Sequence, residues 1–230
     1  MMRAMPGVRW LREARMRWHM AIRKRIVGRG RPVTVMVSVA LVASLGLLAS
    51  CAPGNAAVGD TEGTGTAIHH DSVDRGDIMI GVVGSLDSSA DRTVMTAFAD
   101  ERLKAFYAGA DRTTNSPERY ARSASNDIAA MVDRAVKAIV INRLTMTKAT
   151  RGIWQQALLS ARNAGIPVVL IDARQLPDDA RLYAATLTID DASRHATRLD
   201  TIMQQVINDR PHARAVTVSV KRGTAGTYQS

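Results

Sequence analysis

The chain has 230 residues, one cysteine and a formal net charge of +10 at pH 7. Residues 1–31 carry ten lysines and arginines against one acid, whereas residues 51–230 carry 21 basic and 20 acidic side chains. Because the part that is expected to fold is almost neutral, the charge argues against a nucleic-acid partner, and the single cysteine excludes an internal disulfide.

The first predicted element is an export signal over residues 1–50. A basic region, 1–31, precedes an apolar run, 33–48, which is followed by alanine, serine and cysteine. The stretch 48–51 resembles the lipobox of bacterial lipoproteins, which implies cleavage before Cys51 and its lipidation. The alternative is an uncleaved transmembrane anchor, since about 17 to 20 apolar residues can just span a bilayer. Both alternatives leave the rest of the chain outside the cytoplasmic membrane.

Residues 51–76 are predicted to form a flexible tether. They are rich in glycine, threonine, alanine and aspartate and show no apolar period. The adjacent pair His69 and His70 lies in this stretch. Two neighbouring histidines on a tether are more often polar filler than metal ligands, so we assign no metal site.

From residue 77 onward, short apolar runs alternate with amphipathic segments. Strands are predicted at 78–84, 104–109, 137–142, 167–172, 183–189 and 213–220. Helices are predicted at 93–103, 117–136 and 147–164, and from Asp190 or Asp191 onward with an inner face of Ala192, Ala196, Leu199, Met203 and Val206. This alternation predicts an α/β fold, a parallel sheet with helices on both faces.

Ligands of such sheets bind at the carboxyl ends of the strands, near the point where the strand order reverses. Four polar stretches follow predicted strands in this sequence, at 84–87, 142–144, 172–174 and 190–191. The sequence therefore indicates this edge of the sheet as the ligand-facing one.

Residues 77–226 resemble the sugar-type periplasmic binding proteins of ABC importers, whose type I fold is shared with the effector domains of lac-repressor-like regulators. The resemblance is carried by residues 80–84, 138–141, 161–172 and 188–191. It implies that residues 77–212 form a first lobe of this periplasmic-binding-protein-like I fold and that residues 213–230 begin an incomplete second lobe. A complete second lobe would need roughly a hundred further residues.

The resemblance also implies a set of ligand contacts at the carboxyl ends of the strands: Ser85, Asp87, Ser88, Asn142, Asp172, Arg174 and Asp190. Carboxylates accept hydrogen bonds from hydroxyl groups, and arginine and asparagine donate them, so the set suits a polyol. Each residue can also be a turn or cap, and Asp190 in particular can cap a helix. Trp154 can stack on a sugar or pack a helix, and packing is the favoured interpretation.

The resemblance implies a lipid-anchored substrate-binding protein of a sugar-type ABC importer, at the extracytoplasmic face of the bacterial membrane. It would bind a small polar solute, a sugar in the first instance, without catalysis, cofactor or metal, and hand it to an ABC permease. No nucleophile-elbow, phosphate-loop or dinucleotide motif supports an enzyme. The alternative is a truncated or degenerate surface lipoprotein with an adapter role or no ligand.

Overall fold

A computed structural model describes residues 56–62, 78–109 and 116–221 of the chain. The chain divides into two units, 1–52 and 53–230, and every described residue belongs to the second. The proposed export signal, Cys51 and the histidine pair lie outside the described residues. No helix among the described residues has both the length and the apolar character needed to cross a bilayer.

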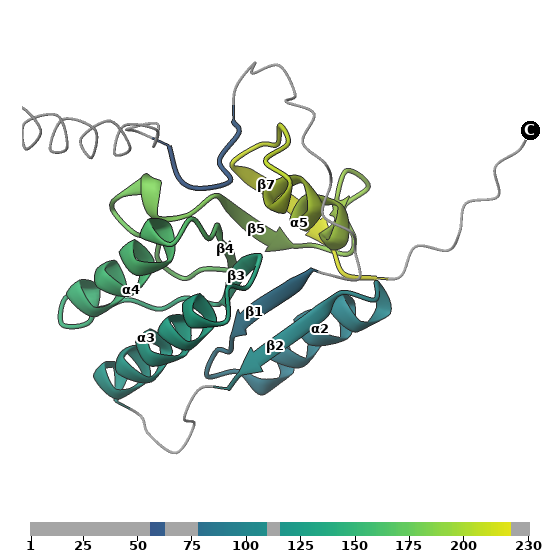
Figure 1. The fold of residues 1–230 in the computed structure, drawn as a ribbon. Coiled ribbons are helices and arrows are strands. Elements are labelled where there is room, and N and C mark those ends of the chain that lie inside the picture. Colours follow the sequence, from purple (N-terminus) through teal and green to yellow (C-terminus); the bar gives the residue numbers. More distant parts are fainter. Residues whose placement is uncertain (1–55, 63–77, 110–115, 222–230) are drawn as a thin grey trace, which may run out of the picture. The chain divides into compact units, whose positions relative to one another are not determined.

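The second unit is built on a seven-stranded sheet in the order β2-β1-β3-β4-β5-β7-β6 (Figure 1). Every neighbouring pair is parallel. The strands are β1 (Met79–Val83), β2 (Lys104–Ala108), β3 (Ala138–Asn142), β4 (Val168–Ile171), β5 (Ala185–Ile189), β6 (Thr197–Arg198) and β7 (Ala215–Ser219). The predicted parallel α/β sheet is confirmed.

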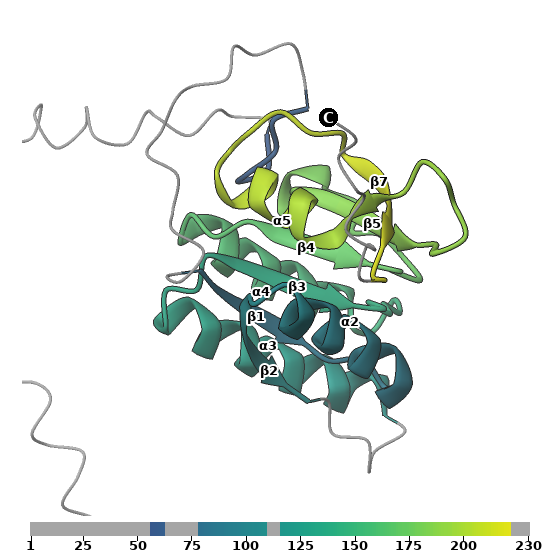
Figure 2. The ribbon, with the colours of Figure 1, turned by 90° about the vertical axis from the view of Figure 1, so that its right-hand side faces the viewer.

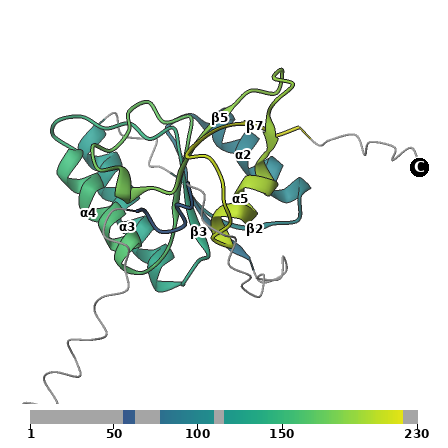
Figure 3. The same ribbon diagram turned by 90° about the horizontal axis from the view of Figure 1, so that it is seen from above.

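Helices cover both faces of this sheet, which is also as predicted (Figure 3). Helices α3 (Pro117–Asp133) and α4 (Arg151–Asn163) pack on one face, and α2 (Ser88–Asp100) and α5 (Leu199–Ile207) on the other. A 3-10 turn, η3 (Ala180–Leu182), precedes β5.

Strand β3 shows how the sequence produces two cores. Ile139 and Ile141 pack with α3 and α4, whereas Ala138 and Val140 pack with α2 and α5, because successive side chains of a strand point to opposite faces. All five residues of β3 are buried. A strand covered on both faces has no polar side to present, which explains its unbroken apolar run.

Two helices begin at other residues than the sequence indicated. Helix α2 begins at Ser88 rather than at residue 93, because the carboxylate of Asp87 accepts hydrogen bonds from the N–H groups of Ser89 and Ala90 (3.0 and 3.2 Å). Helix α4 begins at Arg151 rather than at residue 147. The chain before it forms a turn in which the N–H of Thr147 donates to the Thr150 hydroxyl (2.9 Å).

The last helix differs most from the prediction. Residues 190–196 form turns, and the chain then runs through β6 before α5 begins at Leu199. Leu199, Met203 and Val206 are buried on the inner face of α5, as expected, but Ala192 and Ala196 precede the helix. Asp190 caps no helix: its carboxylate accepts a hydrogen bond from the N–H of Ala192 (2.9 Å), which stabilises the turn.

Strand β7 lies between β5 and β6 in the sheet. Residues 215–219 form a strand, as the sequence predicted for 213–220, and they pair in parallel with β5. The start of a second lobe at residue 213 stays a prediction. The carboxylate of Asp191 holds the end of β7 by accepting hydrogen bonds from the Ser219 hydroxyl (2.8 Å) and the Val220 N–H (2.9 Å). Pairing with β7 satisfies backbone groups of β5 that would otherwise form an open edge.

The four α-helices among the described residues end alike, each with a residue of positive φ just beyond the cap: Arg102, Ala135, Gly165 and Asp209. In α3 the N–H of Val136 donates to the carbonyl of Met131 (3.3 Å), and that of Ala135 donates to Val132 (2.9 Å). This is the Schellman arrangement, in which glycine is favoured. Ala135 holds φ at 50° and is exposed, so it bears backbone strain without a packing role.

Replacing Ala135 by glycine is expected to raise the free energy of unfolding by about 1 kcal/mol, because a left-handed residue with a side chain costs about 1–2 kcal/mol. Urea unfolding followed by circular dichroism measures the change. The matched control is Ala164→Gly at the cap of α4, where φ is −80°. There the same exchange should lower stability by about 0.5 kcal/mol. Changes of the same sign at both positions would contradict the strain argument.

Candidate functional site

The strand order reverses at β1, whose neighbours are β2 on one side and β3 on the other. The carboxyl ends of β1 and β3 therefore form the switch point at which parallel sheets bind ligands. Ser85, Asp87 and Ser88 follow β1, and Asn142 ends β3. The other three predicted contacts follow β4 and β5 along the same edge: Asp172, Arg174 and Asp190.

Two of the predicted contacts, Ser85 and Asn142, are directed into the protein toward Asp91. One carboxylate oxygen of Asp91 accepts three hydrogen bonds of 2.8 Å, from the N–H and hydroxyl of Ser85 and from the side-chain amide of Asn142. The other oxygen accepts one from the Tyr107 hydroxyl (2.8 Å). Ser85, Asn142 and Asp91 are 2%, 1% and 2% exposed. This buried network joins β1, β2, β3 and α2 at the switch point.

Asp91 was not among the residues that the sequence indicated. It lies in the first turn of α2, a stretch that the sequence pattern had indicated as part of the loop before the helix. An acid in the first turn of a helix that follows the first strand of a parallel sheet points back at the sheet edge. The sequence could have indicated Asp91 only if the helix had been predicted to begin at Ser88.

Asp87 has two roles at this edge. It caps α2, and its other carboxylate oxygen forms a close ion pair with Arg143, the residue after β3. A hydrogen bond from the Ser89 hydroxyl, followed by those from backbone N–H groups, lowers the pKa of Asp87. Both side chains are partly exposed, so the pair lies at the surface of the switch point. Ser88 is exposed beside it.

A tyrosine of α3, Tyr120, also stabilises the switch point. The Tyr120 hydroxyl donates to the carbonyl of Gly84 at the end of β1 (3.0 Å). Burial, followed by the nearby Asp91 carboxylate, raises the pKa of Tyr120 far above its ordinary value. The phenol therefore stays protonated and keeps this hydrogen bond at all physiological pH values.

The three contacts predicted after β4 and β5 are more open. Asp172 is half-buried at a φ of 46°, and its carboxylate accepts a hydrogen bond from the N–H of Ile189 (3.0 Å). Arg174 is exposed, and its backbone N–H donates to the carbonyl of Leu144 (2.9 Å). Asp190 is exposed in its turn. The three residues shape the loops of the edge and leave polar groups at the surface.

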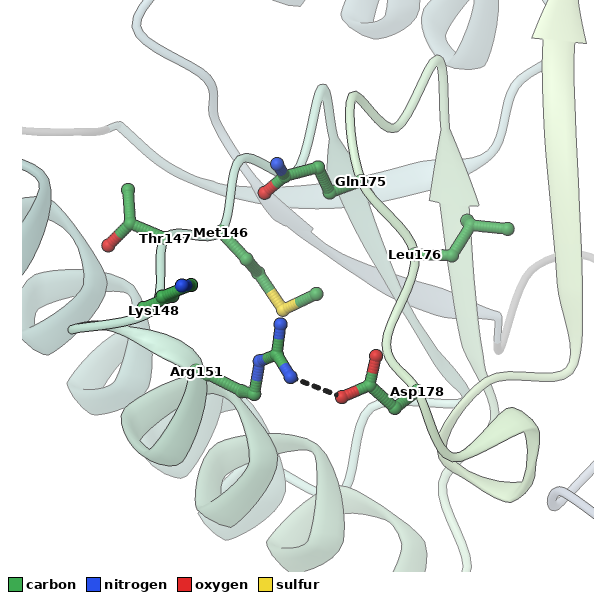
Figure 4. A pocket seen from close by; sticks show the side chains of 7 residues that line it. All are labelled: Met146, Thr147, Lys148, Arg151, Gln175, Leu176 and Asp178. Carbon is green, nitrogen blue, oxygen red and sulfur yellow. Dashed lines mark hydrogen bonds and ion pairs between the residues drawn. The ribbon is translucent and has the colours of Figure 1, made fainter.

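A pocket of about 420 Å³ opens at this edge, between the loops that follow β3 and β4 (Figure 4). Its lining combines two apolar side chains with five polar or charged ones: Met146, Leu176, Thr147, Lys148, Arg151, Gln175 and Asp178. The Arg151 guanidinium donates to the Asp178 carboxylate (2.8 Å), and both side chains are more than half exposed. None of the seven predicted contacts lines the pocket, although Arg174 directly precedes Gln175.

Trp154 lies in the core and not at the edge. It is fully buried, and its ring meets that of Tyr120 at a centroid distance of 5.7 Å and an angle of 59°. The packing interpretation of this tryptophan is therefore confirmed. Within the part of the chain that the structure describes, no group of three or more histidine, cysteine, aspartate or glutamate side chains is placed to hold a metal ion.

No protein-family model matches the chain, and no curated protein matches it by sequence. Among solved structures, it is similar to the periplasmic binding protein component of an arabinose ABC transporter from Shewanella sp. ANA-3, bound to α- and β-L-arabinofuranose. The identity is 16% and the TM-score 0.36, with 62% of this chain and 55% of that protein covered. The chain thus spans about half the length of that binding protein.

Two other solved structures are similar to the chain. One is a pilus assembly-related protein from Burkholderia pseudomallei, with 14% identity, a TM-score of 0.32 and coverage of 65% of this chain and 83% of that one. The other is a de novo designed Rossmann fold protein, with 16% identity, a TM-score of 0.29 and coverage of 45% and 90%. At these identities the likeness concerns the fold alone.

Proposed function

We propose that this chain is a lipid-anchored, extracytoplasmic binding protein that captures a small polar solute, a sugar in the first instance, for an ABC importer. The observation that carries the proposal is the pocket between the loops after β3 and β4. It lies at the carboxyl edge of the sheet, beside the switch point that β1 and β3 form. Its volume of about 420 Å³ is in the lower range of small-molecule sites.

The lining of the pocket suits a hydroxylated solute. Lys148, Arg151 and Gln175 offer hydrogen-bond donors, while Thr147 and Asp178 offer acceptors. The exposed Arg151–Asp178 pair can open to engage neighbouring hydroxyl groups, since an exposed ion pair contributes only about 0–1 kcal/mol. The two apolar side chains, Met146 and Leu176, can cover the less polar face of such a ligand.

The seven predicted contacts have different proposed roles, according to how exposed each side chain is. Ser88, Arg174 and Asp190 are exposed and are proposed to meet the solute at the rim. Asp87 and Asp172 are half-buried and are proposed to shape the loops around it. Ser85 and Asn142 hydrogen bond to Asp91, so we propose that they hold the edge in place.

The test is a titration of the full chain with a panel of sugars, read by thermal shift and calorimetry. One sugar is expected to raise the melting temperature, because a ligand that binds only the folded state stabilises it. Arg151→Ala should then weaken binding by roughly 10- to 100-fold, since a hydrogen bond to a charged group contributes about 1.5–3 kcal/mol. Arg122→Ala, exposed on α3, is the matched control and should bind as the wild type does.

A panel in which no sugar shifts the melting temperature would contradict the solute-binding proposal and favour a surface lipoprotein with an adapter role. If Arg151→Ala bound the sugar as tightly as the wild type does, the chain would still be a binding protein, but its site would not be this pocket.

A further inference from the structure

A short segment, residues 56–62, is docked on the same unit as the sheet (Figure 2). We call it the strap. The Asp60 carboxylate forms a close ion pair with the Arg214 guanidinium, and these side chains are only 7% and 23% exposed. The carbonyl of Gly59 lies 2.7 Å from the Nε2 atom of His212. The strap is therefore held by charge and by backbone contacts.

Packing holds the strap as well. Ala57 is buried, and Gly59 adopts a φ of 72° in close contact with the domain. A Cβ at Gly59 would lie 2.8 Å from the Pro167 Cβ and 3.0 Å from the Val206 carbonyl oxygen. Both ends of the strap are hydrogen bonded to the domain. The Arg162 guanidinium donates to the Ala56 carbonyl, and the Thr61 hydroxyl donates to the Arg210 carbonyl.

The strap lies at the edge of the sheet opposite to the pocket. Its partners Pro167, His212 and Arg214 come directly before β4 and β7, and Arg162 is at the end of α4. The pocket is formed by loops that come after β3 and β4. Since all strands are parallel, the strap marks the amino-terminal edge and the pocket the carboxyl edge.

We propose that the strap fixes the orientation of the domain at the membrane, with the amino-terminal edge toward the bilayer and the pocket away from it. The inference rests on the lipid anchor at Cys51 proposed above. Only residues 52–55 separate Cys51 from the strap, which begins at Ala56, so the reach is at most about 18 Å. With the strap released, residues 52–77 would form one Gly-rich tether with an end-to-end distance of roughly 28 Å and a maximum of about 90 Å.

The two tether lengths have different consequences for delivery. The short tether presents the pocket to the surroundings but does not let the domain turn over. The long tether allows the carboxyl edge to reach a permease in the same membrane. In this proposal, the strap is released between capture of the solute and its delivery.

Two lysines report the orientation directly. Lys137 precedes β3 at the amino-terminal edge, Lys148 lines the pocket at the opposite edge, and both are exposed. The full chain is expressed with its own leader in a bacterial host, extracted from the membrane and reconstituted in phosphatidylglycerol–phosphatidylethanolamine vesicles. A dextran-linked amine reagent labels it there and in detergent, and peptide mass spectrometry gives the ratio of labelled Lys137 to labelled Lys148.

The ratio is expected to fall severalfold on vesicles relative to detergent, because the bilayer shields Lys137. In Gly59→Val the strap cannot dock, and the ratio should return to its detergent value. Asp60→Asn, a milder change, should recover part of it. Gly152→Val adds the same side chain where a Cβ would meet nothing within 4 Å, and it should behave as the wild type does.

The mass of the extracted protein separates the two proposals. An unmodified Cys51 would overturn the lipid anchor and the membrane orientation together. An acylated Cys51 with the same ratio in vesicles and detergent, or with a lowered ratio that persists in Gly59→Val, would overturn the role of the strap and leave the anchor intact.

Discussion

Replacing Asp91 by alanine is expected to lower the free energy of unfolding by about 3–5 kcal/mol, because several buried donors lose their shared acceptor and each unsatisfied donor costs about 1–3 kcal/mol. The substitution leaves the Ser85 N–H and the Asn142 amide in a closed space without an acceptor. It also removes the hydrogen bond from Tyr107 on β2. A loss of this size could unfold a marginally stable domain.

Urea unfolding followed by circular dichroism measures this loss. Asp91→Asn keeps one carbonyl oxygen for Ser85 and Asn142 and should lose about half as much, or roughly 2 kcal/mol. The matched control is Arg92→Ala on the exposed side of α2, which should change stability by less than about 0.5 kcal/mol. An Asp91→Ala protein as stable as this control would show that the network does not support the fold.

Trp154→Ala is expected to have a similar effect, a loss of about 3–5 kcal/mol, because it leaves a large cavity in a core that collapses only partly. Trp154 is among the largest fully buried side chains, and it fills the space between α4 and α3 against Tyr120. Because Tyr120 also braces the end of β1, the cavity should loosen the switch point as well.

The indole nitrogen of Trp154 is buried and has no hydrogen-bond partner. Trp154→Phe therefore removes a polar atom that contributes no bond, and it should cost only about 1–2 kcal/mol for the lost volume. Gln156→Ala, exposed on the same helix, is the control and should be nearly neutral. Equal losses for the alanine and phenylalanine variants would contradict the cavity argument. Thermal and urea unfolding can measure both.

The architecture could be predicted because the apolar runs are unambiguous. The run in β3 has no polar residue before Asn142, so a buried parallel strand was the only fitting element. The helix starts were harder to place where polar residues precede the first apolar turn. The start of α2 depends on one carboxylate, that of Asp87, and such a cap is indistinguishable from a loop aspartate until the chain is folded.

The candidate pocket lies at the edge of the sheet that the sequence indicated, but none of its lining residues was among the predicted contacts. The strand ends identified the edge, since parallel strands bring their carboxyl ends together. The sequence pattern does not predict the direction in which each side chain points. Asn142 turns inward to Asp91, while Lys148 and Gln175, several residues beyond the strands, line the pocket. The export signal and the lobe division remain predictions.

The position of Trp154 has a spectroscopic consequence. The sequence holds three tryptophans, and the other two, Trp10 and Trp18, fall in the proposed signal segment. In a protein cleaved before Cys51, as proposed, the tryptophan fluorescence would come from one indole in the core between α3 and α4. Its emission will therefore report the integrity of that core, so a red shift during unfolding marks the moment at which one face of the sheet opens.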